Sequence, residues 1–191
     1  MTHATRLTRR QSFGLIAGAG VLLGASSAQA EDAAVIDTRV DLALKELYQT
    51  VPGSRDLADR ALGVLVMPSV VKGGFIVGGS YGEGALRLPQ GGALRTNGYY
   101  SVAAASIGLQ AGVQESAHAL FFLTEGALSR FQRADGWEFG ADAEVTLLDK
   151  GVNLGVDSTI YQKPVVAIVF GQDGLLLGAS LEGAKYSPIQ R

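Results

Sequence analysis

The chain of 191 residues contains no cysteine and only two histidines, of which one, His118, lies beyond residue 30. The lack of cysteine excludes disulfides, thiolate metal sites, cysteine nucleophiles and a lipid-modified N-terminal cysteine. A metal site would depend on carboxylates, and the acidic residues that lie close together in the sequence lack the spacing of a calcium loop (Asp135, Glu138, Asp142, Glu144). We therefore expect no metal and no cofactor.

An excess of basic residues is also missing. The chain has 16 basic and 18 acidic residues, and three of the basic ones, Arg6, Arg9 and Arg10, lie within the first 30 residues. Residues 31–191 therefore contain 13 basic and 18 acidic residues, which gives them a net charge of −5. We expect no nucleic-acid partner, because such a chain has no basic field to attract a phosphate backbone.

The first 30 residues have the pattern of an export signal. The pair Arg9-Arg10 precedes an apolar stretch over residues 13–23. This arrangement resembles a twin-arginine signal, although Ser12 stands where an apolar residue is usual, and an ordinary secretory signal is the alternative. A membrane anchor is disfavoured, since the apolar stretch is shorter than the ~20 residues of a spanning helix.

The end of this segment has the small residues of a cleavage site. Ala28 and Ala30 fit the A-x-A pattern, so the mature chain is expected to begin at Glu31. Residues 31–191 are enough for one domain with a sizeable core. We expect a periplasmic protein, either free or peripheral to a membrane.

The hydrophobic pattern changes its period after residue 62. Apolar residues recur at helical spacing over 33–51 and 55–62, whereas the chain from Gly63 onward reads as strands, with one helix over 125–134. The prediction is an α+β fold, in which N-terminal amphipathic helices precede a strongly curved, mostly antiparallel, glycine-rich β-sheet, barrel- or sandwich-like, with one inserted helix.

Four positions carry turn or stop signals. Pro68 predicts the end of the first strand, because proline cannot donate a ladder hydrogen bond. Asn97-Gly98, Lys150-Gly151 and Asp173-Gly174 are typical of hairpin tips.

The stretch GVLVMPSVVKGGFIVGGSYGEGAL, residues 63–86, contains seven glycines. Gly73 and Gly78 have the spacing of a phosphate-binding loop, but no lysine follows, and the glycines at 82 and 84 precede no helix pattern. Residues 31–191 contain 22 glycines, spread over most of the predicted strands. Because the glycines are spread in this way, we expect that the sheet as a whole needs them for its curvature and close packing.

The same stretch contains one match to a hydrolase motif. Residues 78–82 fit G-x-S-x-G, with Ser80 as a candidate nucleophile, Glu83 or Glu115 as the acid and His118 as the base. The motif requires a strand-to-helix turn, and no helix pattern follows Ser80. His118 lies in an alternating strand pattern, so we expect no enzyme.

Four segments in order resemble the SYLF domain family. They are ALGVLVMPSVVKGGFIVGGSYGEGAL (61–86), SIGLQAGVQESAHALFFLTEGALSRF (106–131), GADAEVTLLDKGVN (140–153) and GLLLGASLEGAKY (174–186). The resemblance implies a lipid-binding module. Eukaryotic relatives bind phosphoinositide membranes, fungal ones also bind actin, and bacterial ones are exported. For this chain it implies an anionic lipid or a membrane surface as partner.

Three basic residues are candidates for the lipid contact. Lys72 matches the family's basic residue before the glycine-rich strand, and Arg87 and Arg95 follow in the next strand and loop. If they gather on one rim, they can bind an anionic headgroup by charge-assisted hydrogen bonds. Each residue taken singly is also typical of an ordinary surface charge. The N-terminal helices either insert an apolar face into a membrane or pack it on the sheet.

Three other functions stay open at this stage. The domain can be a structural or protein-interaction module of the envelope with no specific lipid. An eight-stranded outer-membrane barrel suits the length, but not the charged helices at the start. A hydrolase that uses Ser80 is the third.

Overall fold

The computed structural model describes residues 32–74, 77–107, 112–148, 158–171, 174–175, 181 and 183–191. The helices are α1 (Ala33–Thr50), α2 (Ser54–Arg60), α3 (Glu125–Arg133) and the 3-10 helix η1 (Ser158–Gln162). The strands are β1 (Gly63–Gly74), β2 (Val77–Gln90), β3 (Ala93–Ile107), β4 (Gly112–Phe122), β5 (Trp137–Glu138), β6 (Val145–Leu148), β7 (Val165–Gly171), β8 (Gly174–Leu175) and β9 (Lys185–Ile189).

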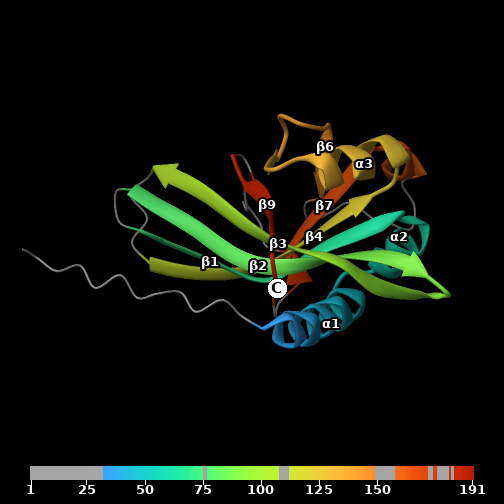
Figure 1. The fold of residues 1–191 in the computed structure, drawn as a ribbon, viewed down its shortest axis with the longest axis horizontal. Coiled ribbons are helices and arrows are strands. Elements are labelled where there is room, and N and C mark those ends of the chain that lie inside the picture. The colour runs from blue at the N-terminus through green and yellow to red at the C-terminus, as the bar shows by residue number, and fades with distance from the viewer. Residues whose placement is uncertain are drawn as a thin grey trace, which may run out of the picture.

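All these strands belong to one sheet, in the order β5-β9-β3-β2-β1-β4-β7-β6, with β8 paired to β7. The described pairs are antiparallel except β6 and β7, which run parallel. Figure 1 shows a curled sheet with α1 on one face and α3 on the other. The predicted α+β fold is confirmed. None of the described helices combines the length and the apolar character needed to cross a bilayer.

Alternate residues of the central strands face two separate cores. On β1, Val64 and Val66 lie in the core shared with α1, whereas Leu65 and Met67 lie in the core shared with α3. Helix α1 buries a stripe at helical spacing in the first core (Ile36, Val40, Ala43, Leu44, Leu47). The apolar face of α1 therefore packs on the sheet, as one of the two interpretations of the helix predicted.

The second core is rich in aromatic side chains. The ring of Phe131, on α3, lies 4.7 Å from that of Tyr100 and 4.8 Å from that of Phe122, measured between centroids. Trp137 meets the Phe131 ring edge-on at 5.6 Å. Helix α3 begins after Thr124, whose hydroxyl oxygen accepts a hydrogen bond from the Ala127 amide at 3.3 Å.

Strand β1 does not end at Pro68, which corrects the sequence prediction. On the β2 side, the register steps from Val66 opposite Ala85 to Ser69 opposite Glu83, so Met67 and Pro68 together oppose Gly84. This is a β-bulge, where an extra residue is left outside the ladder and a proline is tolerated in a central strand.

The glycines opposite the bulge permit a close approach of two backbones. A Cβ added to Gly84 would lie 2.9 Å from Met67 Cα, and one added to Gly82 would lie 3.1 Å from Val70 Cα. Neither distance leaves room for a side chain. The glycine-rich stretch thus serves close packing at a bend, as predicted.

The β2–β3 turn is Gly91-Gly92 and not Asn97-Gly98. Gln90 pairs with Ala93, and both intervening glycines have positive φ, 60° and 81°, as a type I′ turn requires. Asn97 is the unpaired residue of a second bulge, because Leu86 pairs with Gly98 and Arg87 with Thr96.

The two later hairpin predictions have different outcomes. Strands β7 and β8 form a hairpin, in which Gly171 pairs with Gly174, while residue 173 lies outside the described residues. The tip predicted at Lys150-Gly151 also lies outside them, and the preceding strand β6 is described only in its parallel pairing with β7.

Candidate functional site

The three basic residues predicted to contact lipid do not gather on one rim. Lys72 is exposed on β1, opposite Ser80 of β2, whereas Arg87 lies seven residues further along β2, about 23 Å away at the usual rise of a strand. Arg95 is exposed on β3 and pairs with Leu88, so it faces the side of the sheet opposite to Arg87. Their role in lipid binding stays a prediction.

Arg87 is engaged inside the protein. Only 7% of it is exposed, and its Nη2 donates to Asp41 Oδ1 at 2.9 Å and to the Asp37 carbonyl oxygen at 3.1 Å. The hydroxyls of Thr96 and Tyr99 donate to the Asp37 carboxylate at 2.8 and 3.1 Å. Desolvation and this hydrogen bond raise the pKa of Tyr99. These contacts hold α1 against β2 and β3. The Arg87 guanidinium is therefore not free to bind a lipid headgroup.

The hydrolase interpretation is wrong. Ser80 lies inside the continuous strand β2 and not on a strand-to-helix turn. It pairs with Lys72, which in turn pairs with Gln114 of β4, so His118 is two strands away and four residues further along β4. Strand β1 and four residues of β4 therefore lie between the proposed nucleophile and the proposed base.

His118 belongs to the core that α3 shares. Its Nε2 lies 3.2 Å from Ser116 Oγ, and its Nδ1 lies 3.5 Å from the Tyr186 hydroxyl oxygen. Burial lowers the pKa of His118 to about 4, because desolvation disfavours the charged imidazolium. The ring is therefore neutral at pH 7.

In the part of the chain that the structure describes, no three His, Cys, Asp or Glu residues are grouped to hold a metal ion. In the acidic region singled out by sequence, Asp142 Oδ2 accepts a hydrogen bond from the Glu138 amide at 2.6 Å, which is a turn contact.

Among the described residues, no helix covers the sheet where β1–β4 run beyond the helices (Figure 1). We call residues 71–74, 77–82, 102–107 and 112–115 of these strands the open sheet end. Three large apolar side chains are exposed here: Val113 (76%), Tyr81 (48%) and Val71 (45%). Val71 pairs with Tyr81, and Gly73, two residues on, pairs with Val113, so all three share one face.

The two faces of the open sheet end differ in polarity. Two rows of paired residues cross the face that carries Val113 (Ala103, Tyr81, Val71, Glu115; then Ala105, Gly79, Gly73, Val113). The row between them points to the reverse face and is more polar (Ala104, Ser80, Lys72, Gln114). We call the side of the first two rows the apolar face, and Glu115 is its one charged residue.

The edges of the open sheet end are unpaired within the described residues. Strand β9 pairs with β3 only as far as Ala103, and β7 pairs with β4 only from Ala117. Four of the eight residues in the two rows of the apolar face are glycine or alanine, so this face has little relief.

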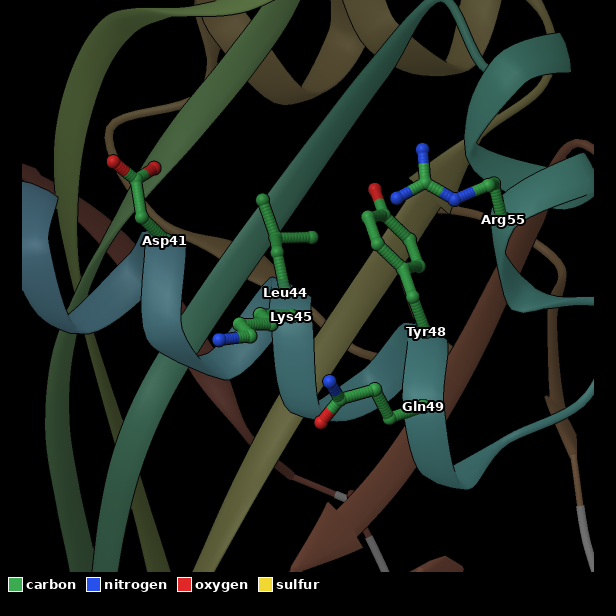
Figure 2. Close-up of a pocket in the computed structure, with 6 residues that line it drawn as sticks. All are labelled: Asp41, Leu44, Lys45, Tyr48, Gln49 and Arg55. Atoms are coloured by element: carbon green, nitrogen blue, oxygen red, sulfur yellow. The ribbon is translucent and has the colours of Figure 1, made fainter.

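A hollow of about 360 Å³ lies on α1 and α2, and Figure 2 shows the residues that line it. The Arg55 guanidinium stacks on the Tyr48 ring, 4.5 Å from its centroid. Burial raises the pKa of Tyr48, and the charge of Arg55 opposes this shift. Lys45 points away from Arg55, and Asp41 is engaged by Arg87. The two cations do not converge, so this hollow is no anion site.

Sequence reasoning overlooked the open sheet end, although a signal was present. Residues 73–82 and 102–113 contain no charged residue, whereas charged residues make up 18% of the chain. The pairing of these segments in one sheet could not be read from composition, because the bulges set which residues share a face.

A comparison with family models matches residues 103–190 to the Ysc84 family, described as "Las17-binding protein actin regulator". No curated protein matches the chain. The matched residues run from β3 to β9 and share one sheet with β1 and β2. The family is generally non-catalytic. Residues 103–190 thus match the Ysc84 family, which is the SYLF family that the sequence resembles.

Proposed function

We propose that this protein is a non-enzymatic lipid-binding domain that attaches to membrane surfaces. The observation that carries the proposal is the two-sided character of the open sheet end. Val71, Tyr81 and Val113 are exposed together on the apolar face, while Lys72 lies on the polar reverse face. A sheet that is apolar on one side and polar on the other fits the boundary between lipid and water.

The energetics indicate a weak and readily reversible attachment. Burying the exposed parts of three such side chains contributes roughly 2–4 kcal/mol. This is less than a single myristoyl chain provides, and one such chain holds a protein only marginally. The association of the Ysc84 family with lipid binding and actin regulation supports the proposal. Of the three predicted basic residues, Lys72 alone belongs to the open sheet end, so we propose that it contacts phosphate groups.

A protein partner is the second candidate. The description of the family names binding to a protein, Las17, and an uncovered apolar face also suits a protein interface. We test the two candidates by floating the full mature chain with vesicles of phosphatidylcholine and of phosphatidylcholine with phosphatidylglycerol. Flotation with either vesicle supports the lipid function. If the chain does not float at low salt and captures a stoichiometric protein from envelope extract, the lipid function is wrong and the protein-partner function takes its place.

We also propose that residues 1–30 direct export to the periplasm through Arg9-Arg10. The support is the sequence pattern of the segment and the A-x-A site at Ala28 and Ala30. The test replaces both arginines with lysine and follows the protein by fractionation. The proposal is supported if the lysine variant is lost from the periplasm and the unchanged protein has its N-terminus at Glu31 there. Unchanged export of the variant would favour an ordinary secretory signal.

A further inference from the structure

We infer that the open sheet end enters the boundary between headgroups and acyl chains, with its strand ends leading and its apolar face toward the hydrocarbon. Attachment then depends on acyl chains and not on an anionic headgroup. This inference rests on the proposed lipid-binding function, for which it names the contacting surface and the part of the lipid that is recognised.

The first argument is the distribution of charge along the strands. The residues nearest the strand ends, 73–74 of β1, 77–80 of β2, 104–107 of β3 and 112–113 of β4, include no charged residue. Lys72 and Glu115 are the charged residues of the open sheet end, and both lie behind these positions. The leading part can therefore leave water without desolvating a charge, which is the largest cost of entering an apolar medium.

The second argument is the position of Tyr81. It lies two residues behind the row of Val113, and its hydroxyl donates to Glu83 Oε1, further back along β2, at 2.6 Å. Glu83 is also bound by the Arg191 guanidinium at 2.6 Å. The ring faces the apolar side while its hydroxyl is held toward the body of the protein. Tyrosines occupy this orientation at membrane interfaces.

The third argument concerns depth. The outer edges of β3 beyond Ala103 and of β4 before Ala117 have no ladder partner among the described strands. Unpaired backbone groups cannot enter the hydrocarbon centre, so the contact must be shallow. The two residues from the row of Val113 to that of Val71 span about 7 Å of strand. This length matches the ~5–10 Å to which interfacial elements sink.

The fourth argument is the placement of Lys72 on the reverse face. Its long side chain can reach back to the phosphate level while the strand beside it is in contact with acyl chains. Glu115, the charge on the apolar face, accepts a hydrogen bond from the Ser69 hydroxyl at 2.6 Å, behind the leading residues. Every phospholipid carries a phosphate, so neither residue requires a net anionic lipid.

The experiment uses two tryptophan variants of the mature chain, V113W and the matched control L42W. Both positions are exposed, at 76% and 61%, and Leu42 lies on α1. The native Trp137 is buried and gives the same background in both variants. Each variant is bound to phosphatidylcholine vesicles whose acyl chains carry bromine, and tryptophan quenching is measured. We expect a blue shift and quenching for V113W, and neither for L42W.

Four outcomes are possible, and they separate the inference from the proposed function. Quenching of V113W alone supports the inference. Flotation with quenching of L42W, or of neither variant, overturns the inference and leaves the lipid function standing. Flotation only with anionic vesicles also overturns it, in favour of headgroup recognition. If the protein floats with no vesicle, and sedimentation shows a dimer that V113W weakens, both the inference and the proposed lipid function are overturned. The apolar face is then assigned to contact with a second copy of the chain.

Discussion

The substitution Gly84→Ala tests whether the glycines of β2 are there for close backbone approach. Gly84 opposes the Met67-Pro68 bulge, and a new Cβ would lie 2.8 Å from Met67 Sδ and 2.9 Å from Met67 Cα. The sulfur can move, but the Cα belongs to a central strand that is paired on both sides. The methyl group is therefore expected to push β1 away from β2.

The magnitude follows from the cost of overpacking. Inserting one carbon into a packed core costs roughly 1–3 kcal/mol, and here the obstacle is backbone, so we expect the upper part of that range. Alanine recovers about 0.4–1 kcal/mol by restricting the unfolded chain. The net loss is about 2 kcal/mol in the free energy of unfolding, or roughly 4–8 °C in Tm for a domain of this size.

The assay is urea unfolding followed by circular dichroism, with Gly79→Ala as the matched control on the same strand. A Cβ on Gly79 would come no closer than 3.5 Å to the Ala104 carbonyl oxygen, which is ordinary contact. We expect this variant to be unchanged or stabilised by up to about 1 kcal/mol. Equal stability of the two variants would refute the role of Gly84 in close packing.

Two further predictions concern buried polar groups. Burial lowers the pKa of His118 to about 4 from an ordinary 6.5, so between these pH values the unfolded chain binds a proton that the folded protein does not. The free energy of unfolding therefore falls by about 3 kcal/mol as the pH drops from 6.5 to 4. The variant H118Q should lack this contribution when unfolding is measured across that range, and a pH profile equal to that of the unchanged protein would contradict the prediction. Replacing the buried Arg87 with methionine removes three contacts to α1 and should lower the free energy of unfolding by about 1–3 kcal/mol. The variant D41N, at an exposed carboxylate, should lower it by less than about 1 kcal/mol. Thermal unfolding compares the two variants, and equal losses would contradict the view that the Arg87 cluster holds α1 on the sheet.

The parts of the fold that sequence predicted are those set by local pattern. The stripe Ile36, Val40, Leu47 identifies α1 and its buried face, and the helical spacing over residues 125–134 identifies α3. These signals depend on neighbours within one or two turns of the chain. The family resemblance drew on segments between residues 61 and 186, and the family match confirms it over residues 103–190.

The errors arose where a residue's role depends on the strand beside it. Considered alone, Pro68 predicts the end of a strand and Asn97-Gly98 predicts a turn, because each is a breaker. Both lie in bulges, where the partner strand supplies the pairing. Nothing local in the sequence shows that Asp37 and Asp41, 50 and 46 residues earlier, reach Arg87, so sequence alone leaves Arg87 among the surface cations.

The site was harder to predict than the fold for the same reason. Val71, Tyr81 and Val113 come from three strands, and their common face depends on two registers and one bulge. Charge depletion over residues 73–82 and 102–113 was the one local signal, and it becomes informative only when pairing brings the segments together.

The central claim, that the open sheet end is the membrane-binding surface, is tested most directly by the partition of two aspartate variants onto phosphatidylcholine vesicles. V113D places a charge on the apolar face, and L42D places the same charge at an exposed apolar position of α1. We predict that V113D lowers the partition coefficient on the order of tenfold or more, while L42D leaves it unchanged. Equal partition of V113D and the unchanged protein, or a loss confined to L42D, would contradict the account.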